Sequence, residues 1–122
     1  MKTDELKNRT KQFAIRVIKM TNALPPTQIS KVITNQILRS STSVGANYRA
    51  ACRARSEKDF LSKITIVEEE TDETLFWLEL ISELELLPLS KIENLMKEAD
   101  ELVAIFTASG KTMAQKLNKK TS

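Results

Sequence analysis

The chain has 122 residues, a formal net charge of +3, one cysteine and no histidine. This length predicts a single domain, and the scarcity of glycine and proline (two and three residues) favours helices over a β-sandwich or barrel. The absence of histidine removes the commonest general base and metal ligand, and a lone cysteine cannot form an internal disulfide.

The first predicted helix runs from about Asp4 to Ala23, and Thr3 or Asp4 could cap its start. The helix is expected to stop at Ala23 because Leu24 is followed by two prolines, which exclude helical geometry. A second helix is predicted over residues 28–54 with Thr27 as its cap. The residues that periodicity places in the core of these helices are Leu6, Phe13, Val17, Met20, Leu24, Ile33, Ile37, Ser40, Val44, Asn47, Tyr48 and Ala51.

The third predicted helix covers about residues 56–86, with Ser56 as its cap, and the fourth starts after a cap at Ser90. Gly110 is the expected end of the fourth helix. The chain therefore divides into a bundle, residues 1–110, and a polar lysine-rich tail, residues 111–122. The main core stripe expected of the third helix is Ile66, Glu70, Glu73, Trp77, Leu80 and Leu84, with a second set of apolar residues at Leu61, Ile64, Val67, Leu75, Leu78 and Ile81.

Four helices with short connections predict an all-α, antiparallel up-down-up-down four-helix bundle. Small residues around Gly45 predict a close helix crossing there, since glycine in a helix interior usually permits close approach of another backbone. No apolar run is long enough for a membrane span, and the N-terminal segment lacks the apolar stretch of a signal peptide. We therefore expect a cytoplasmic protein with no membrane partner.

Charge is distributed unevenly along the chain. Residues 1–58 carry twelve bases and three acids, a balance of +9, which leaves −6 for the rest. Basic helices could pack beside acidic helices and be neutralised there, or they could form a surface for nucleic acid. The densest basic cluster, Arg49, Arg53, Arg55 and Lys58, could be a solvated face or a phosphate-binding patch.

Polar residues occur where helical periodicity predicts core. If the second and third helices turn at Ser56, Arg39 lies opposite Glu73 and close to Glu70, so these residues are candidates for an ion-pair network that also includes Asn47. Such a network would be buried or would face another subunit. The alternative is a carboxylate metal site, but ferritin-like bundles also use histidine, which is absent.

Other reactive or aromatic side chains have structural and functional interpretations. Tyr48, Phe76 and Trp77 could stack on nucleobases, but core or subunit-interface positions are favoured for Tyr48 and Trp77. Cys52 is interpreted as a small packing residue, because no histidine is present to activate it. We therefore expect no catalytic residue, no metal and no cofactor.

The sequence resembles a family of small bacterial four-helix-bundle proteins named after those encoded in intervening sequences of 23S ribosomal RNA genes. The resemblance covers about residues 6–106. Where many members carry an acidic residue, this chain has alanine at positions 50 and 51. The residues that carry the resemblance are Gln36, Ile37, Leu38, Arg39, Ser40, Ser41, Ser43, Val44, Gly45, Ala46, Asn47, Ser56, Lys58, Asp59, Phe60, Lys63, Glu70, Glu73, Trp77 and Leu78.

The resemblance implies a left-handed bundle that assembles into a homopentameric ring and has no established enzymatic activity. A similarly shaped pentameric bundle is the accessory protein of diversity-generating retroelements, where it binds nucleic acid and a reverse transcriptase. This analogy of fold indicates nucleic acid as a partner. The first hypothesis is a non-catalytic oligomeric bundle that binds structured RNA or DNA. The alternative is an oligomeric protein-interaction scaffold, and the third is a carboxylate-dependent enzyme using Glu69, Glu70 or Glu73.

Overall fold

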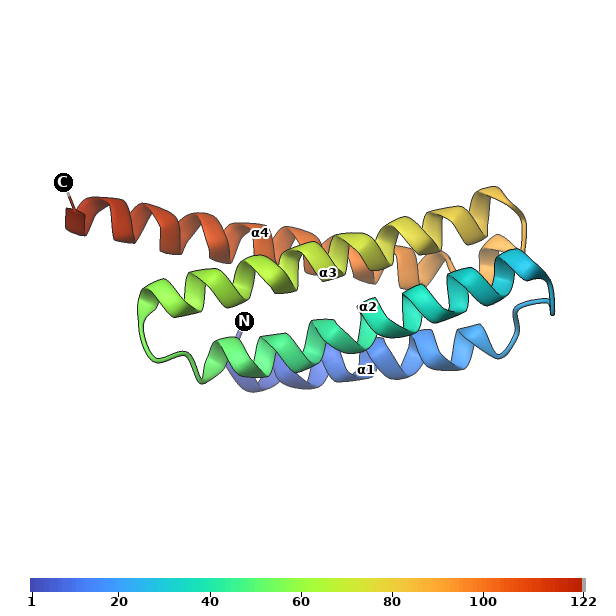
Figure 1. Ribbon diagram of the computed structural model, residues 1–122, viewed down its shortest axis with the longest axis horizontal. Helices are drawn as coiled ribbons and strands as arrows, with labels where there is room; N and C mark the ends of the chain where they lie inside the picture. Colours follow the sequence, from blue (N-terminus) through green and yellow to red (C-terminus); the bar gives the residue numbers. More distant parts are fainter. Residues whose placement is uncertain (122) are drawn as a thin grey trace.

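The computed structural model describes residues 1–121 as an elongated assembly of helices (Figure 1). No strand occurs in that part of the chain, so the prediction of an all-helical fold with four long helices is confirmed. A short 3-10 helix, η1, precedes the last long helix. The elements are α1 (Thr3–Thr21), α2 (Gln28–Cys52), α3 (Glu57–Glu83), η1 (Leu89–Lys91) and α4 (Glu93–Thr121).

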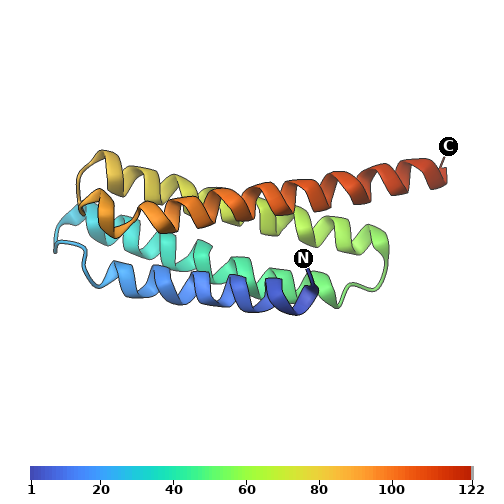
Figure 2. The same cartoon turned by 180° about the vertical axis from the view of Figure 1, so that it is seen from behind.

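The chain passes back and forth along one long axis, so helices that follow one another in sequence lie side by side (Figures 1 and 2). α4 also contacts α1, which closes the bundle. Hydrogen bonds between side chains join neighbouring helices. Among them, the Thr74 hydroxyl lies 2.8 Å from the Ser40 hydroxyl, and Thr107 donates to Glu68 over 2.6 Å. The last turns of α4 extend beyond the turn that joins α2 to α3 (Figure 1).

Two of the predicted helix caps are confirmed. The hydroxyl of Thr27 accepts a hydrogen bond from the Ser30 amide, and that of Ser56 accepts from the Asp59 amide. The Asp59 carboxylate in turn accepts from the Arg55 amide at 3.1 Å, so a second free N–H at the start of α3 is satisfied.

Two other predicted caps are wrong. α1 begins one residue earlier than expected, and its capping position is Lys2, which makes no side-chain capping bond. Ser90 lies inside η1 rather than at the start of α4, because the chain first forms a 3-10 turn after Pro88. Acidic residues in the first turns of α1 and α4 still interact favourably with the helix dipoles.

The core follows the predicted stripes in the first two helices. Phe13, Val17, Ile33, Ile37 and Val44 are fully buried between the helices. Leu24 is only partly buried. Of Asn47 and Tyr48, which were both predicted in the core, only Tyr48 is buried.

The main core stripe predicted for α3 is wrong. Ile66 and Leu84 are exposed by 44% and 51%, whereas Thr71 and Thr74 are fully buried. The threonines can be buried because their hydroxyls donate to the carbonyls of Val67 and Glu70 one turn earlier, at 2.6 and 2.8 Å. The buried line of α3 is Ile64, Val67, Thr71, Thr74, Leu78 and Ile81.

The expected end of α4 at Gly110 is also wrong, because the helix continues to Thr121. Gly110 has no positive φ, which a glycine that terminates a helix usually requires. The segment predicted as a tail is therefore helical over residues 111–121, and position 122 lies outside the described residues. Glu57 at the start of α3 forms ion pairs with Lys116 and Lys120 of this extension.

Candidate nucleic-acid interface

The four basic residues singled out from the sequence lie around the end of α2 and the start of α3. Arg49 is in the last turn of α2, Arg53 caps that helix, Arg55 lies in the turn, and Lys58 is in the first turn of α3. All four are exposed. They do not line one common hollow, because Arg49 faces α1 whereas Arg55 borders an opening between the helix ends.

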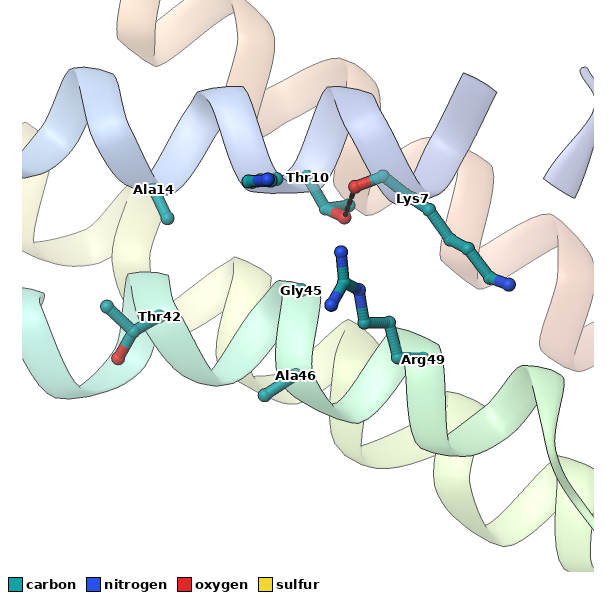
Figure 3. Close-up of a pocket in the computed structure, with 8 residues that line it drawn as sticks. Lys7, Thr10, Ala14, Thr42, Gly45, Ala46 and Arg49 are labelled. Carbon is teal, nitrogen blue, oxygen red and sulfur yellow. Dashed lines mark hydrogen bonds between the residues drawn. The ribbon is translucent and has the colours of Figure 1, made fainter. Parts of the chain in front are cut away.

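Arg49 borders a surface hollow of about 260 Å³ between α1 and α2. Figure 3 shows its guanidinium extending from α2 toward α1 beside Gly45. The hollow is bounded by Lys7, Thr10, Lys11, Ala14, Thr42, Gly45, Ala46 and Arg49, three of them basic and none acidic. Lys7 and Lys11 were not singled out from the sequence, although their i, i+4 spacing places them on one face of a helix.

A second hollow with three bases lies between α1 and the start of α4. Its volume is about 390 Å³, and its lining also contains no acid. The basic side chains are Arg16, Lys19 and Lys91.

Most bases of the first half of the chain lack an acidic partner. Of the twelve in residues 1–58, only Arg9 and Arg39 form an ion pair with any residue that the structure describes. Arg9 pairs with Glu98 and Glu101 of α4, and these carboxylates raise the pKa of the arginine. Packing of basic helices against acidic helices therefore neutralises only a small part of the charge.

The pairing expected for Arg39 is present, at the surface of the single chain. Its guanidinium donates to Glu70 at 2.9 Å and to Glu73, and the Trp77 indole N–H donates to Glu73 at 3.0 Å. The Arg39 side chain is half exposed, while Glu70 is mostly covered. The cluster is thus not part of the core of one chain.

The contacts between Arg39, Glu73 and Trp77 favour the charged forms of Arg39 and Glu73. The hydrogen bond from Trp77, followed by the one from Arg39, holds the pKa of Glu73 below its usual value. Glu73 in turn raises the pKa of Arg39. Arg39 thereby uses its donors on two carboxylates of α3.

Asn47 does not join this network, contrary to the prediction. Its side-chain amide donates to the Ser43 carbonyl at 2.8 Å and to the Ser43 hydroxyl at 2.7 Å, one turn earlier in the same helix. The i, i+4 geometry of the helix satisfies the amide locally, so it needs no partner on α3.

The aromatic residues occupy different environments. Tyr48 is buried with its ring centroid 5.6 Å from that of Phe106, and burial, followed by the nearby Cys52, raises the pKa of Tyr48 to about 12. Trp77 is partly buried, whereas Phe76 is half exposed. Tyr48 is therefore a core residue in this chain, and Phe76 is the aromatic side chain most open to a partner.

No group of three potential metal-ligating side chains occurs in residues 1–121. Over the same residues, no helix is long and apolar enough to cross a membrane.

Residues 2–108 match the model of the 23S rRNA-intervening sequence protein family. The chain belongs to this family, as the resemblance of its second and third helices indicated. The match includes all of α1, α2 and α3 and the first half of α4.

A solved structure supports the same assignment. The chain is similar to a crystal structure from Bacteroides thetaiotaomicron of a protein with unknown function from the S23 ribosomal protein family, with 34% sequence identity and a TM-score of 0.80. The similarity covers 87% of this chain and 98% of that one. No curated protein matches the sequence.

Proposed function

We propose that this protein is a non-catalytic, cytoplasmic oligomer of antiparallel up-down-up-down bundles that binds structured RNA or DNA through backbone phosphates. The observation that carries this proposal is the excess of basic residues on α1 and α2 without acidic partners. An unneutralised cluster of arginine and lysine is the usual electrostatic feature of a nucleic-acid surface. The family's association with ribosomal RNA genes agrees with RNA as the ligand.

The positions of the basic residues support contacts with the backbone rather than with bases. Arg49, Arg53, Arg55 and Lys58 are spread over a helix end, a turn and a helix start, and all are exposed. Phosphate contacts tolerate such a spread, because they fix position without reading sequence. We therefore expect binding to depend on the folded or duplex form of the nucleic acid and not on a particular base sequence.

The test is equilibrium binding of a structured ribosomal RNA fragment to the Arg49→Glu/Arg53→Glu variant. Each reversal replaces attraction to phosphate with repulsion, so we expect at least about a hundredfold weaker binding at low salt. The control is Lys97→Glu/Lys111→Glu, the same change of net charge at two exposed residues of α4. Circular dichroism checks that the variants remain helical. Unchanged affinity in the folded double variant, or absence of binding by the wild type, would reject the proposal.

Exposed apolar residues on α2 and α3 support oligomerisation, with a pentameric ring as the proposed form. Ile29 and Val32 on α2 share the helical face of Arg39, while Ile66 and Leu84 on α3 share that of Glu70 and Glu73. Phe76, half exposed, adjoins this surface. We call these five apolar residues and the Arg39 cluster the α2–α3 face. A neighbouring subunit would cover apolar side chains that are otherwise open to water.

The same observation keeps the second candidate function open. A ring that presents repeated surfaces could serve as an adaptor for another protein without binding nucleic acid. Purification from the native host discriminates the two: RNA that remains bound at low salt favours the first function, whereas a stoichiometric protein partner without nucleic acid favours the adaptor.

A further inference from the structure

The hollow between α1 and α2 brings three cations together from two helices. Lys7 and Lys11 are one turn apart on α1, and Arg49 follows Gly45 by one turn on the facing helix. Figure 3 shows Arg49 reaching into the gap that Gly45 leaves open, with Lys7 projecting from the opposite helix. None of the three forms an ion pair with a residue of the described chain, 1–121.

This arrangement is unfavourable in the absence of an anion. Like charges one turn apart on a helix repel, and Lys7 and Lys11 are such a pair. Arg49 adds a third positive charge from the facing helix, and the lining supplies no acid. An anion seated among the three would remove this repulsion.

The hydrogen-bonding groups of the hollow also select an anion. The Thr10 hydroxyl already donates to the Leu6 carbonyl at 2.8 Å, and the Thr42 hydroxyl to the Leu38 carbonyl at 2.7 Å. The donors left for a ligand are therefore those of the three cations. The Arg49 guanidinium matches the oxygens of a phosphate group, which arginine can bind with two parallel hydrogen bonds, and the flexible side chains of Lys7 and Lys11 line the same hollow from the facing helix.

The small side chains provide the space for such a group. Ala14, Gly45 and Ala46 line the hollow, so the backbone of α2 is open beside Arg49. A larger residue at position 46, which is exposed, would occupy the opening without touching the core.

We infer that Lys7, Lys11 and Arg49 form a phosphate-binding site between α1 and α2 that holds one phosphate group of the bound nucleic acid. This inference rests on the proposed function for the source of the phosphate. The chemistry is shared with free phosphate, so the experiment includes both sources.

Two variants test the site by different means. Lys11→Gln/Arg49→Gln removes two of its charges, and Ala46→Leu fills the opening at constant charge. The matched controls are Arg16→Gln/Lys19→Gln, which removes two bases of α1 outside this hollow, and Ala104→Leu, which enlarges an exposed alanine of α4. Binding of a structured RNA is measured as a function of salt, and inorganic phosphate is titrated while backbone amide NMR shifts are followed.

We expect inorganic phosphate to shift amides near residues 7–11 and 45–49 in the wild type, and both site variants to lose that response. We also expect Ala46→Leu to weaken RNA binding about tenfold, a loss of about 1.4 kcal/mol, while Ala104→Leu leaves it unchanged. Loss of binding in the charge variant should exceed that in Arg16→Gln/Lys19→Gln, since only the former removes the site.

The outcomes separate this inference from the proposed function. RNA binding that survives both site variants at wild-type strength overturns the site and leaves nucleic-acid binding in place. A phosphate response at these amides without any RNA binding supports the site, assigns it to free phosphate and rejects the proposed function. No response of these amides to phosphate or RNA overturns the inference.

Discussion

Gly45 shows how close a helix crossing can be without requiring glycine. A Cβ added there would lie 3.4 Å from the Thr10 hydroxyl oxygen and 3.6 Å from the Thr10 carbonyl carbon, which are ordinary contact distances. The small residues predicted close approach of another backbone, and the structure shows that α1 approaches here while leaving room for a methyl group.

Gly45→Ala should therefore stabilise the protein. Alanine is favoured over glycine in a helix interior by about 1 kcal/mol, and we expect a gain of about 0.5–1 kcal/mol in the free energy of unfolding. Urea unfolding at one protein concentration measures it, because the stability of an oligomer depends on concentration. Gly110→Ala is the comparison, since its Cβ would meet only Ile64 at 3.9 Å. A loss of stability for Gly45→Ala alone would mean a tighter crossing than described.

Glu73 should contribute a pH-dependent part of the stability. Trp77 and Arg39 hold its pKa below that of the unfolded chain, about 4.3. The carboxylate therefore stabilises the fold above that pH, and the contribution is lost as pH falls through its folded pKa. Because the pair is partly exposed, we expect a contribution below about 1 kcal/mol.

The measurement compares urea midpoints of the wild type and Glu73→Gln at about pH 6 and about pH 3. The wild type should lose more stability on acidification than the variant, because the other acids titrate in both proteins. Equal losses would show that the contacts of Glu73 do not stabilise the fold.

At the scale of elements, α4 is the helix whose extent was hardest to predict. Its last turns pass the start of α3, where Glu57 contacts Lys116 and Lys120, and these lysines lower the pKa of Glu57. Glycine at position 110 indicated a stop, but the helix-forming residues beyond it and the distant Glu57 favour continuation. A contact about sixty residues away leaves no local signal in the sequence.

Glu57→Gln should loosen the end of α4. Without the carboxylate, Lys116 and Lys120 lose their partner, so amides of residues 111–121 should exchange hydrogen faster while those of α2 keep their rates. Hydrogen exchange followed by mass spectrometry or NMR resolves this difference. Glu83→Gln on the same helix, a residue exposed at the far end of α3, is the control. Unchanged exchange in residues 111–121 would show that Glu57 does not hold the extension.

Helical periodicity predicted α1 and α2 well because apolar residues mark their buried faces clearly. It misplaced the main core stripe of α3, where apolar residues occur on more than one side and Thr71 and Thr74 satisfy their hydroxyls locally. Four residues of the second predicted set are buried as expected: Ile64, Val67, Leu78 and Ile81. The sequence also located Arg49 but not its neighbours Lys7 and Lys11. Which face of α1 meets α2 depends on packing that spacing alone does not determine.

At the scale of the whole molecule, the proposed subunit interface accounts for the stripe of α3 that was wrongly predicted as core. Ile66 and Leu84 follow a regular helical spacing although neither is covered within one chain. A second subunit on the α2–α3 face would bury this stripe in the core between the two subunits. It would also shield the Arg39 cluster from solvent and strengthen its interactions.

Phe76→Glu should therefore dissociate the proposed oligomer into smaller species. A carboxylate on the α2–α3 face would be buried without a partner, which is strongly unfavourable. Native mass spectrometry should show a pentamer for the wild type and smaller species for the variant, with unchanged helix content by circular dichroism. Ile18→Glu, at an apolar residue of α1 exposed by 41%, should leave the assembly intact. An unaffected pentamer in the Phe76 variant would place the interface elsewhere.

The claim that unpaired bases of α1 and α2 bind phosphates is tested most directly by the salt dependence of RNA affinity. The logarithm of the association constant should fall linearly with the logarithm of salt concentration, by about 0.7–0.9 per phosphate neutralised. For the wild type we expect a slope corresponding to several phosphates, reduced in Arg49→Glu/Arg53→Glu. An affinity that does not change with salt, or no association at low salt, would contradict the account.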